Sequence, residues 1–387
     1  MQNPVFSTKR ILKIAIATTG RFHVLDLARE LSRLGHEVKF YSYVPKKRAV
    51  RYGLPPACHI SLLPYLFPLV ILSRLLGRWA RPYASKWIHL CSDWLVCRKL
   101  QACDVFIGMS GIYLAAPKLA KKKFGAKIFI ERGSRHIQSQ YAILRELPGV
   151  ELPSNFDIQR ELTTYEIADK VVIPSSHVRD SFLEYGFSDQ RLFINPYGVD
   201  TRLFVPDEQE TAIDKAIVIF TGTWCQRKGA DLVIETVKRL DGLTLLHVGP
   251  IGDQAFPNDP SFIHYAAVDQ MRLPEFYRKA NIFVLPSREE GFGLVIAQAL
   301  GCGLPVVCTE RTGGPDLIPM MDYPEAIITV PTDNIEALAN GMRKALSLSR
   351  IVAGKDFLGE KGRQSMSWAA YGKRYEVELL NVMMTRN

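Results

Sequence analysis

Residues 287–309 read SREEGFGLVIAQALGCGLPVVCT and contain a strand-to-helix-to-strand transition. An apolar strand pattern at 282–286 precedes them, a glycine-containing turn follows, and an apolar helix at 293–299 leads into a second apolar run at 305–309. Strands connected in this way through a helix are parallel neighbours in one sheet. The stretch therefore predicts an α/β fold.

The same alternation extends outward in both directions from this stretch. In the second half, the predicted helices are 230–240, 273–279, 293–299 and 334–348, and the predicted strands are 216–221, 244–248, 282–286, 305–309 and 326–330. In the first half, a helix is predicted at 23–34 and strands at 11–18, 36–43, 104–108, 127–131 and 170–174. A polar, proline-containing stretch at 196–212 separates the two series. We expect two doubly wound, Rossmann-like domains, 1–200 and 201–370, facing each other across a cleft that holds the ligand.

Composition places the chain among globular proteins of two or three domains. It has 387 residues, of which 47% are hydrophobic and 23% charged, so extended disorder, collagen-like repeats and coiled coils are disfavoured. Seven cysteines without a C-x-x-C pair argue against a disulfide framework or a zinc site and favour a reducing, cytosolic compartment. The apolar run 11–17, interrupted by Lys13, is too short for a signal peptide or a membrane span.

The positive charge is concentrated in the first half. The net charge is +10, and residues 1–200 contain 29 Lys and Arg against 16 Asp and Glu. Between positions 46 and 130 there are 15 basic residues and two acids. Nucleic acid, anionic lipid or an acidic substrate would each be attracted by such a field. Nucleic acid is disfavoured because the sequence has no helix-turn-helix, zinc finger or RNP-type strand.

Two segments carry the chemistry. After the strand ending at 286, Glu289 and Glu290 precede the Gly-Phe-Gly turn at 291–293, whose N–H groups and following helix form a site for a phosphate. Gln298 lies two helical turns beyond Glu290 on a similar face. The second segment, FTGTWCQRKGAD at 220–231, presents Arg227 and Lys228 where a loop meets a helix, which suits a diphosphate. The alternative is that these are ordinary turns with solvated charges.

Together these segments resemble the family 4 glycosyltransferases of the GT-B fold. The resemblance runs through the C-terminal half in order and spacing, and it rests on YEIADKVVIP (165–174), NPYGVDTRLF (195–204), RKG (227–229), LPEFYRKANIFVLPSREEGFG (273–293), GLPVV (303–307), GGPDLI (313–318) and Ser367-Trp368. The N-terminal half matches only through Thr19-Gly20 and ERGSRH at 131–136. The resemblance implies that 1–200 is the acceptor domain, 201–370 the donor domain, and 371–387 a helix that crosses back to the first domain.

The family's roles carry over to particular positions. The resemblance implies catalytic roles for Glu290, Arg227, Lys228 and His136, the last facing the donor sugar, although a histidine in a basic loop is more often a surface residue. It implies donor binding by Gly20, Gly222, Thr223, Val268, Gly291, Phe292, Gly293, Leu294 and Gln298, and acceptor binding by Arg21, His23, Arg132 and Arg135. Two positions depart from the family pattern: Gln298 replaces a glutamate that grips the ribose, and Thr223 replaces an arginine.

The implied reaction is a retaining hexosyl transfer from a nucleotide sugar, with no metal and no cofactor. The acceptor would be a saccharide or a lipid-linked saccharide, in surface polysaccharide or glycolipid synthesis. The alternatives from other classes are a GT-B-fold protein that binds a nucleotide sugar without turnover, which Thr223 and Gln298 make conceivable, and an epimerase. The sequence leaves the sugar, the nucleotide, the acceptor and the oligomeric state open.

The stretch 61–100 combines a short apolar run with tryptophans and cations. Its notable residues are Arg74, Arg78, Trp79, Arg81, Lys86, Trp87 and Trp94. Amphipathic helices with this composition suit a lipid interface. We expect a cytoplasmic protein, peripheral on the inner face of an anionic membrane; the alternative is that the apolar residues pack on the core of the first domain.

Overall fold

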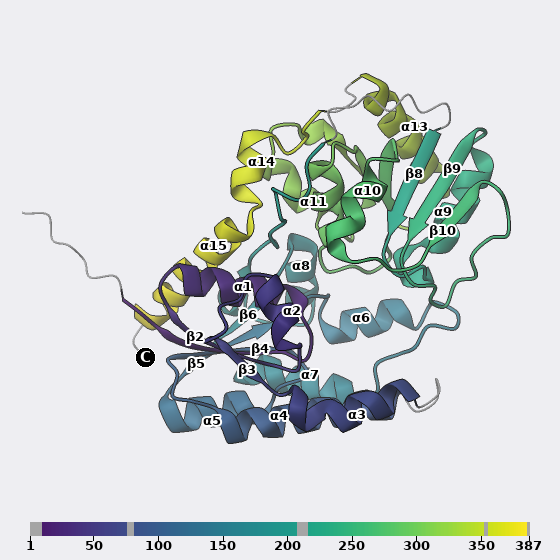
Figure 1. Cartoon of the computed structure of the whole chain (residues 1–387). Coiled ribbons are helices and arrows are strands. Elements are labelled where there is room, and N and C mark those ends of the chain that lie inside the picture. Colours follow the sequence, from purple (N-terminus) through teal and green to yellow (C-terminus); the bar gives the residue numbers. More distant parts are fainter. Residues whose placement is uncertain (1–9, 76–80, 207–215, 352–354, 385–387) are drawn as a thin grey trace, which may run out of the picture. The chain divides into compact units, whose positions relative to one another are not determined.

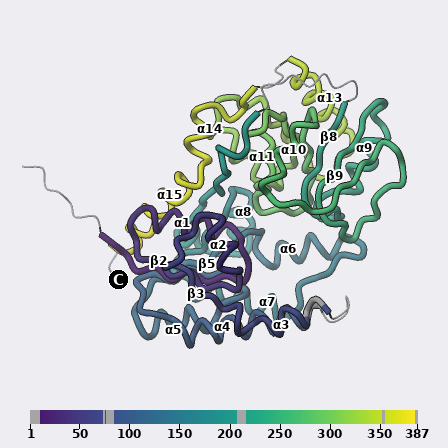
Figure 2. The backbone as a smooth tube through the Cα atoms, viewed as in Figure 1, coloured from purple at the N-terminus to yellow at the C-terminus, as the bar shows by residue number. Residues whose placement is uncertain are grey.

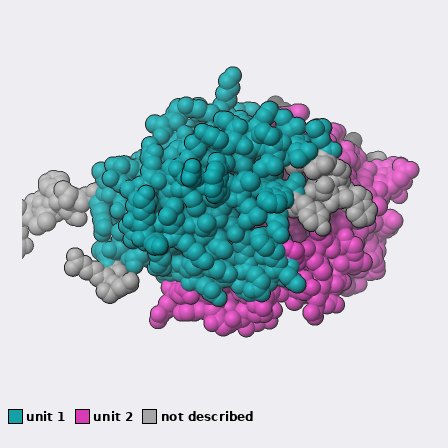
Figure 3. Space-filling model, turned by 90° about the horizontal axis from the view of Figure 1, so that it is seen from below, with its two compact units in different colours: residues 1–131, 155–172, 372–387 teal, residues 132–154, 173–371 magenta. Residues whose placement is uncertain are grey.

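The computed structural model describes residues 10–75, 81–206, 216–351 and 355–384, without the side chains of 73, 74 and 81–83 (Figure 1). The chain forms two compact units, coloured separately in Figure 3. Unit 1 comprises 1–131, 155–172 and 372–387, and unit 2 comprises 132–154 and 173–371. The units thus divide the chain at other points than residues 200 and 370. The segment 132–154 belongs to unit 2 because it packs on later loops, such as that of Gly291.

The first sheet lies mainly in unit 1 and has the strand order β3-β2-β1-β4-β5-β6-β7. Its strands are β1 (Lys13–Ala17), β2 (Glu37–Ser42), β3 (His59–Ser61), β4 (Val105–Met109), β5 (Lys127–Glu131), β6 (Lys170–Ile173) and β7 (Leu192–Ile194). The pairings described from β3 to β6 are all parallel. The strand order reverses between β1 and β4, so the loops that follow these two strands flank the topological switch point.

Helices cover both faces of this sheet (Figures 1 and 2). The helices of this half are α1 (Phe22–Arg33), α2 (Lys46–Arg51), α3 (Leu63–Leu75), α4 (Arg81–Lys99), α5 (Ala115–Phe124), α6 (Ile137–Leu144), α7 (Asn155–Ile167) and α8 (Ser176–Glu184). In Figure 1, α1 and α2 lie on one side of the sheet and α3, α4 and α5 on the other. Helix α1 buries Val24, Leu27, Ala28 and Leu31, the spacing of three and four residues that predicted it.

The second sheet lies in unit 2 and has the order β10-β9-β8-β11-β12-β13, with every pair parallel. Its strands are β8 (Ala216–Thr221), β9 (Leu243–Val248), β10 (Phe262–Tyr265), β11 (Ile282–Leu285), β12 (Val306–Thr309) and β13 (Ile327–Val330). The later helices are α9 (Ala230–Arg239), α10 (Leu273–Tyr277), α11 (Leu294–Gly301), α12 (Gly314–Leu317), α13 (Ile335–Ile351), α14 (Gly359–Ser365) and α15 (Trp368–Met384). The strand order reverses between β8 and β11.

The α/β class predicted from the sequence is confirmed, and each predicted strand is present within two residues at either end. Three short strands, β3, β7 and β10, were not predicted. Each has only three or four residues and lies at the edge of its sheet, where one side is unpaired and no long apolar run is needed.

The stretch 61–100 forms the helices α3 and α4, which contact each other. Of its predicted interfacial residues, Arg78 and Trp79 and the side chains of Arg74 and Arg81 lie outside the described residues. Within the described part of the chain, no helix combines the length and the apolar character needed to cross a bilayer.

Candidate functional site

The loops after β8 and β11 bring an ion pair together at the switch point of the second sheet. The Nζ atom of Lys228 lies 2.7 Å from Oε2 of Glu290, and a guanidinium nitrogen of Arg227 lies 3.8 Å from the same oxygen. The side chains of Lys228 and Glu290 are 14% and 17% exposed, so each is accessible but largely desolvated. Because the carboxyl ends of adjacent parallel strands meet at one edge, two segments 62 residues apart form one polar site.

The two cations dominate the electrostatics of Glu290. Burial by itself would raise the pKa of this carboxyl, but Lys228 and Arg227 outweigh it and lower the pKa. Burial likewise disfavours charge on Arg227, yet Glu290 and Glu289 raise its pKa overall. Glu290 and Arg227 are therefore both charged at neutral pH. A diphosphate that entered here would meet two cations, one of them already paired with a carboxylate that can accept hydroxyl hydrogen bonds.

Glu289 is a site residue whose contacts the sequence did not reveal. Its side chain is fully buried, and its carboxylate accepts hydrogen bonds from Arg227 (3.2 Å), from the Gln140 amide (3.2 Å) and from the Arg135 backbone N–H (3.4 Å). Arg227 also donates to the Glu289 carbonyl at 2.7 Å. Glu289 thus fixes the guanidinium of Arg227 and connects it to the segment that begins at Arg132.

The turn before α11 depends on two glycines. Gly293 caps α11 with φ +78°, a conformation that favours glycine, and a Cβ there would lie 3.6 Å from Cγ of Glu290, so the start of the helix borders the ion pair. At Gly291, an added Cβ would lie 1.7 Å from the Gly133 carbonyl oxygen, so no side chain fits. The side chain of Phe292 is 2% exposed and packs on Tyr197, so this residue presents its backbone to the turn.

Two side chains of the α8 segment hold the Gly291 carbonyl, and neither was a predicted site residue. Ser175 Oγ donates to this oxygen at 2.7 Å, and His177 Nε2 lies 3.2 Å from it. Burial lowers the pKa of His177 to about 4, and Arg135 adds to the effect. The imidazole is therefore neutral at pH 7 and donates through Nε2–H. Only the fold, which brings residues 114 and 116 positions apart into contact, reveals this role.

Gln298 lies on α11, in the second half of the helix. It is 6% exposed, and its Oε1 accepts a hydrogen bond from the Tyr277 hydroxyl at 3.2 Å, which in turn contacts Thr221 Oγ1 at 3.0 Å. The contact orients the amide so that its oxygen faces Tyr277 and its NH2 group remains available as a donor. A glutamate at this position would offer an acceptor instead, so the departure from the family pattern changes the hydrogen-bonding character of this position.

The remaining predicted donor residues of unit 2 lie at the same edge of the sheet. Gly222 and Thr223 directly follow β8, and Val268 comes three residues after β10. A Cβ on Gly222 would lie 3.4 Å from the Nζ of Lys228, so this turn borders the ion pair. Leu294 is the first residue of α11.

His136, Arg132 and Arg135 are held within unit 2. The His136 ring stacks on Tyr185 at 4.7 Å and meets the edge of Phe182 at 5.0 Å, and burial followed by the Arg132 charge lowers its pKa to about 4. Arg132 donates to the carbonyl of Arg135 and to the Gln140 side chain. Arg135 donates to Ser139 Oγ and to the His177 carbonyl.

The other predicted residues, Gly20, Arg21 and His23, lie in unit 1 at the carboxyl end of β1. The guanidinium of Arg21 lies 3.5 Å from the centre of the Tyr52 ring. His23 Nε2 is 2.8 Å from Glu131, whose other oxygen accepts a hydrogen bond from Tyr375 at 2.7 Å. His23 and Glu131 are both buried, so this contact ties α1 to β5.

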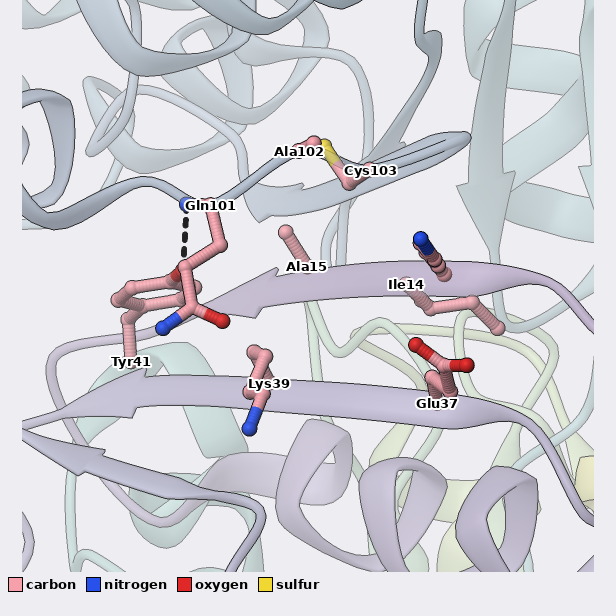
Figure 4. Close-up of a pocket in the computed structure, with 9 residues that line it drawn as sticks. Ile14, Ala15, Glu37, Lys39, Tyr41, Gln101, Ala102 and Cys103 are labelled. Carbon is pink, nitrogen blue, oxygen red and sulfur yellow. Dashed lines mark hydrogen bonds between the residues drawn. The ribbon is translucent and has the colours of Figure 1, made fainter.

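A small cavity of about 40 Å³ lies on one face of β1 and β2 in unit 1 (Figure 4). Lys13 and Ala15 face it from β1, Glu37, Lys39 and Tyr41 from β2, and Gln101–Cys103 cover it. The Gln101 backbone N–H donates to the Tyr41 hydroxyl at 3.1 Å across one end. None of the predicted site residues lines this cavity.

Comparison with known proteins gives consistent results for both halves. A model described as Glycosyltransferase Family 4 matches residues 21–203, and one described as Glycosyl transferases group 1 matches residues 215–347. A D-inositol 3-phosphate glycosyltransferase from Catenulispora acidiphila is 29% identical over 327 residues, 76% of this chain and 74% of that protein. One from Mycobacteroides abscessus is 29% identical over 202 residues, 46% of this chain and 44% of its own length.

Solved structures match at the level of the fold. Sucrose-phosphate synthase from Thermosynechococcus elongatus has a TM-score of 0.62 at 17% identity, over 96% of this chain and 99% of that one. Anabaena HepE in complex with UDP-glucose has a TM-score of 0.66 at 12% identity, over 96% and 99%. The chain, with its two parallel sheets, therefore has the GT-B fold expected from the sequence. With successive family models spanning residues 21–203 and 215–347, the chain belongs to the family 4 glycosyltransferases.

Proposed function

We infer that this protein transfers a hexosyl group from a nucleotide-sugar donor to a saccharide or lipid-linked acceptor. The observation that carries this proposal is the Lys228–Glu290 pair at the switch point, bordered by Arg227 and the start of α11. The cations and helix N–H groups suit a diphosphate, and the Glu290 carboxylate suits sugar hydroxyls. An assay of donor turnover with a panel of UDP-, GDP- and ADP-sugars tests it; binding of a donor without turnover, with every acceptor tried, would favour the non-catalytic binding protein.

The proposed reaction retains the anomeric configuration. The bond between the anomeric carbon and the diphosphate oxygen breaks, a bond to the acceptor oxygen forms on the same face, and the acceptor proton passes to the departing oxygen. Arg227, Lys228 and the α11 amides stabilise the negative charge that grows on the leaving group. Proton NMR of fresh product against the donor tests the stereochemistry, and an inverted product rules the proposal out.

The same residues support a reaction without a metal or another cofactor. The Arg227 guanidinium group, the Lys228 ammonium group and a helix N-terminus supply the positive charge that a divalent ion supplies in other phosphate sites. We expect turnover to persist unchanged after dialysis against EDTA. Loss of activity that added Mg²⁺ or Mn²⁺ restores would contradict this part of the proposal.

We also propose that the protein acts peripherally at the cytoplasmic face of an anionic membrane, in polysaccharide or glycolipid synthesis. The surface in question, the α3–α4 face, consists of exposed apolar side chains on these two helices. On α3, Tyr65, Phe67, Ile71, Leu72 and Leu75 are between 40% and 77% exposed. On α4, Trp87 and Trp94 are 60% and 58% exposed. Aromatic and aliphatic groups of this kind partition into the headgroup region of a bilayer.

The charges around this face favour anionic lipid. Lys99 lies over the Tyr65 ring at 4.4 Å and Arg98 over the Trp94 ring at 5.4 Å, so cations accompany the aromatic groups. The neighbouring helix α5 adds four exposed lysines, Lys118, Lys121, Lys122 and Lys123. The one acidic residue of the three helices, Asp93, is buried, and its carboxylate accepts from Arg160 and from three N–H groups at the start of α5.

Vesicle sedimentation tests this face. We expect binding to vesicles of phosphatidylcholine with phosphatidylglycerol, weaker binding at high salt, and little to phosphatidylcholine alone. The double substitution Trp87→Ala and Trp94→Ala should weaken binding, whereas Ile351→Ala, an exposed apolar residue on α13, should not. The proposal would be overturned if the double variant and Ile351→Ala pelleted equally with the vesicles. It would also be overturned if the protein did not bind vesicles and instead formed a dimer that high salt does not dissociate.

A further inference from the structure

Two paired histidines, one buried and one exposed, lie directly behind the donor loop, which we define as residues 222–228. His247 belongs to β9 and is fully buried, and His264 belongs to the neighbouring strand β10. Their Nδ1 atoms are 2.9 Å apart and their rings are nearly parallel, with 5.0 Å between ring centres. The other nitrogen of His247, Nε2, lies 2.9 Å from the carbonyl oxygen of Gly222.

The Gly222 carbonyl is aimed at β9 by close contacts. Gly222 has φ +121°, and its N–H donates to the Val248 carbonyl at 3.0 Å. At Gly249, a Cβ would lie 2.0 Å from the Gly222 oxygen, so the absence of a side chain there lets the loop approach. The carbonyl consequently faces a buried imidazole, which supplies its hydrogen-bond donor.

The hydrogen-bonding chemistry fixes both tautomers. A carbonyl oxygen can only accept, so Nε2 of His247 carries a proton. The space between the two Nδ1 atoms holds one proton, and since His247 is neutral with Nε2 protonated, that proton belongs to His264. Burial lowers the pKa of His247 to about 4, which keeps the ring neutral. Trp224 and Phe256 pack around it at 5.0 and 5.7 Å between ring centres.

We propose that His247 is a positioning residue for the donor loop, with its Nε2–H tautomer set by the Gly222 carbonyl and supported by an N–H from His264. The hydrogen bond to Gly222 places the turn that borders the Nζ of Lys228, and Lys228 in turn pairs with Glu290. The pair therefore acts on donor affinity through the loop, without touching the donor itself. The inference deepens the proposed function and rests on it for the identity of the ligand.

Substitutions at His247 separate positioning from simple packing. His247→Phe keeps an aromatic ring and removes the donor, while His247→Gln retains an N–H near the position of Nε2. We expect hydrogen exchange of the 222–228 segment to accelerate in His247→Phe and to return toward the wild-type rate in His247→Gln. UDP affinity, measured by isothermal titration, should fall roughly tenfold in His247→Phe and be partly restored in His247→Gln. The acceptor KM should remain unchanged in both.

A second variant and a control keep the test decisive. His264 is exposed, so His264→Phe removes the second partner of His247 without a cavity, and ¹⁵N shifts should still report the Nε2–H tautomer because the Gly222 carbonyl requires it. His59→Phe on β3 of unit 1 should alter none of these quantities.

Unchanged exchange in the donor loop of His247→Phe, or an Nδ1–H tautomer of wild-type His247, overturns the proposal even if UDP proves not to be the ligand. Wild-type protein that shows the expected tautomer and exchange but binds no UDP, GDP or ADP contradicts the donor-site assignment instead.

Discussion

At the scale of single residues, the site is a set of paired charges in which each carboxylate has a different task. Glu290 is partly exposed and pairs with Lys228, whereas Glu289, the preceding residue, is fully buried and holds Arg227. A buried carboxylate that loses its partners remains as an uncompensated charge, so breaking these contacts costs more free energy than breaking a surface ion pair. The two glutamates can be distinguished by experiment.

If the proposed donor site is correct, Lys228→Met should lower kcat/KM for the donor about 10²- to 10³-fold, because the site loses a cation for the diphosphate. It should also move the acidic limb of the pH–rate profile upward. Lys228 lowers the pKa of Glu290, and without it burial raises that pKa, so Glu290 protonates at a higher pH. Rates measured from pH 5 to 8 test this, with Lys238→Met on the exposed face of α9 as the control. An unshifted limb would show that Glu290 does not govern it.

Glu289→Gln should destabilise unit 2 by about 1 to 3 kcal/mol and lower donor affinity. The amide keeps one acceptor oxygen but removes the negative charge that faces Arg227, which is 30% exposed and partly solvated. Thermal melts and UDP titration measure the two effects. Glu275→Gln, which affects an exposed pair with Arg272, is expected to change neither. Equal effects of both substitutions would contradict the role of Glu289.

The sequence could predict Glu290, Arg227 and Lys228 as candidates because each lies in a local strand-to-helix turn. It could not predict the roles of Glu289, Ser175 and His177. Their partners are Gln140, Arg135 and the Gly291 carbonyl, which lie more than a hundred positions away, and no local pattern distinguishes a buried glutamate from a solvated one. The contacts of these residues depend on packing between distant segments.

At the scale of elements, the loops after β8 and β11 have their shapes because backbone segments come into close contact. Gly249 lies against the Gly222 carbonyl and Gly291 against the Gly133 carbonyl. The predicted strands and helices are present because apolar runs and three- and four-residue spacing are local signals. Short edge strands such as β10 lack this local signal, so only the structure reveals them. The turn at Gly291 could not be predicted locally either, since its requirement for glycine comes from contact with Gly133 and not from its own dihedral angles.

Gly291→Ala should lower the free energy of unfolding by more than about 2 kcal/mol and abolish donor binding, because the new Cβ would overlap the Gly133 carbonyl. Gly186→Ala is the matched control: it has φ +76° and nothing within 4 Å, so only backbone strain of about 1 kcal/mol is expected. Chemical denaturation measures both. A Gly291→Ala protein as stable as Gly186→Ala would show that the loop moves aside freely.

At the scale of the whole molecule, buried neutral histidines make stability depend on pH. His136, His177 and His247, all in unit 2, have pKa values lowered to about 4, mainly by burial. In the unfolded chain their pKa is about 6.5, so below that pH the unfolded state binds more protons. The free energy of unfolding is therefore unaffected by these three histidines above pH 6.5, and it decreases as the pH falls from 6.5 toward 4.

We therefore expect the melting temperature of unit 2 to fall between pH 7.5 and pH 5, with each of the three imidazoles contributing roughly 1 to 2 kcal/mol. Scanning calorimetry across this range measures the shift. His136→Phe should make the dependence shallower because it removes one of the three groups. A melting temperature that rises on acidification, or an identical slope in the variant, would contradict this reading.

The division into units also bears on how the protein can be cut. Four times along the sequence, at 131/132, 154/155, 172/173 and 371/372, the polypeptide passes from one unit to the other. Neither unit is encoded by one continuous gene segment, so expression of residues 1–200 or 201–387 alone would leave each fragment missing pieces of its own core. Nicking by a protease near residue 206 should accordingly yield two halves that remain folded only together.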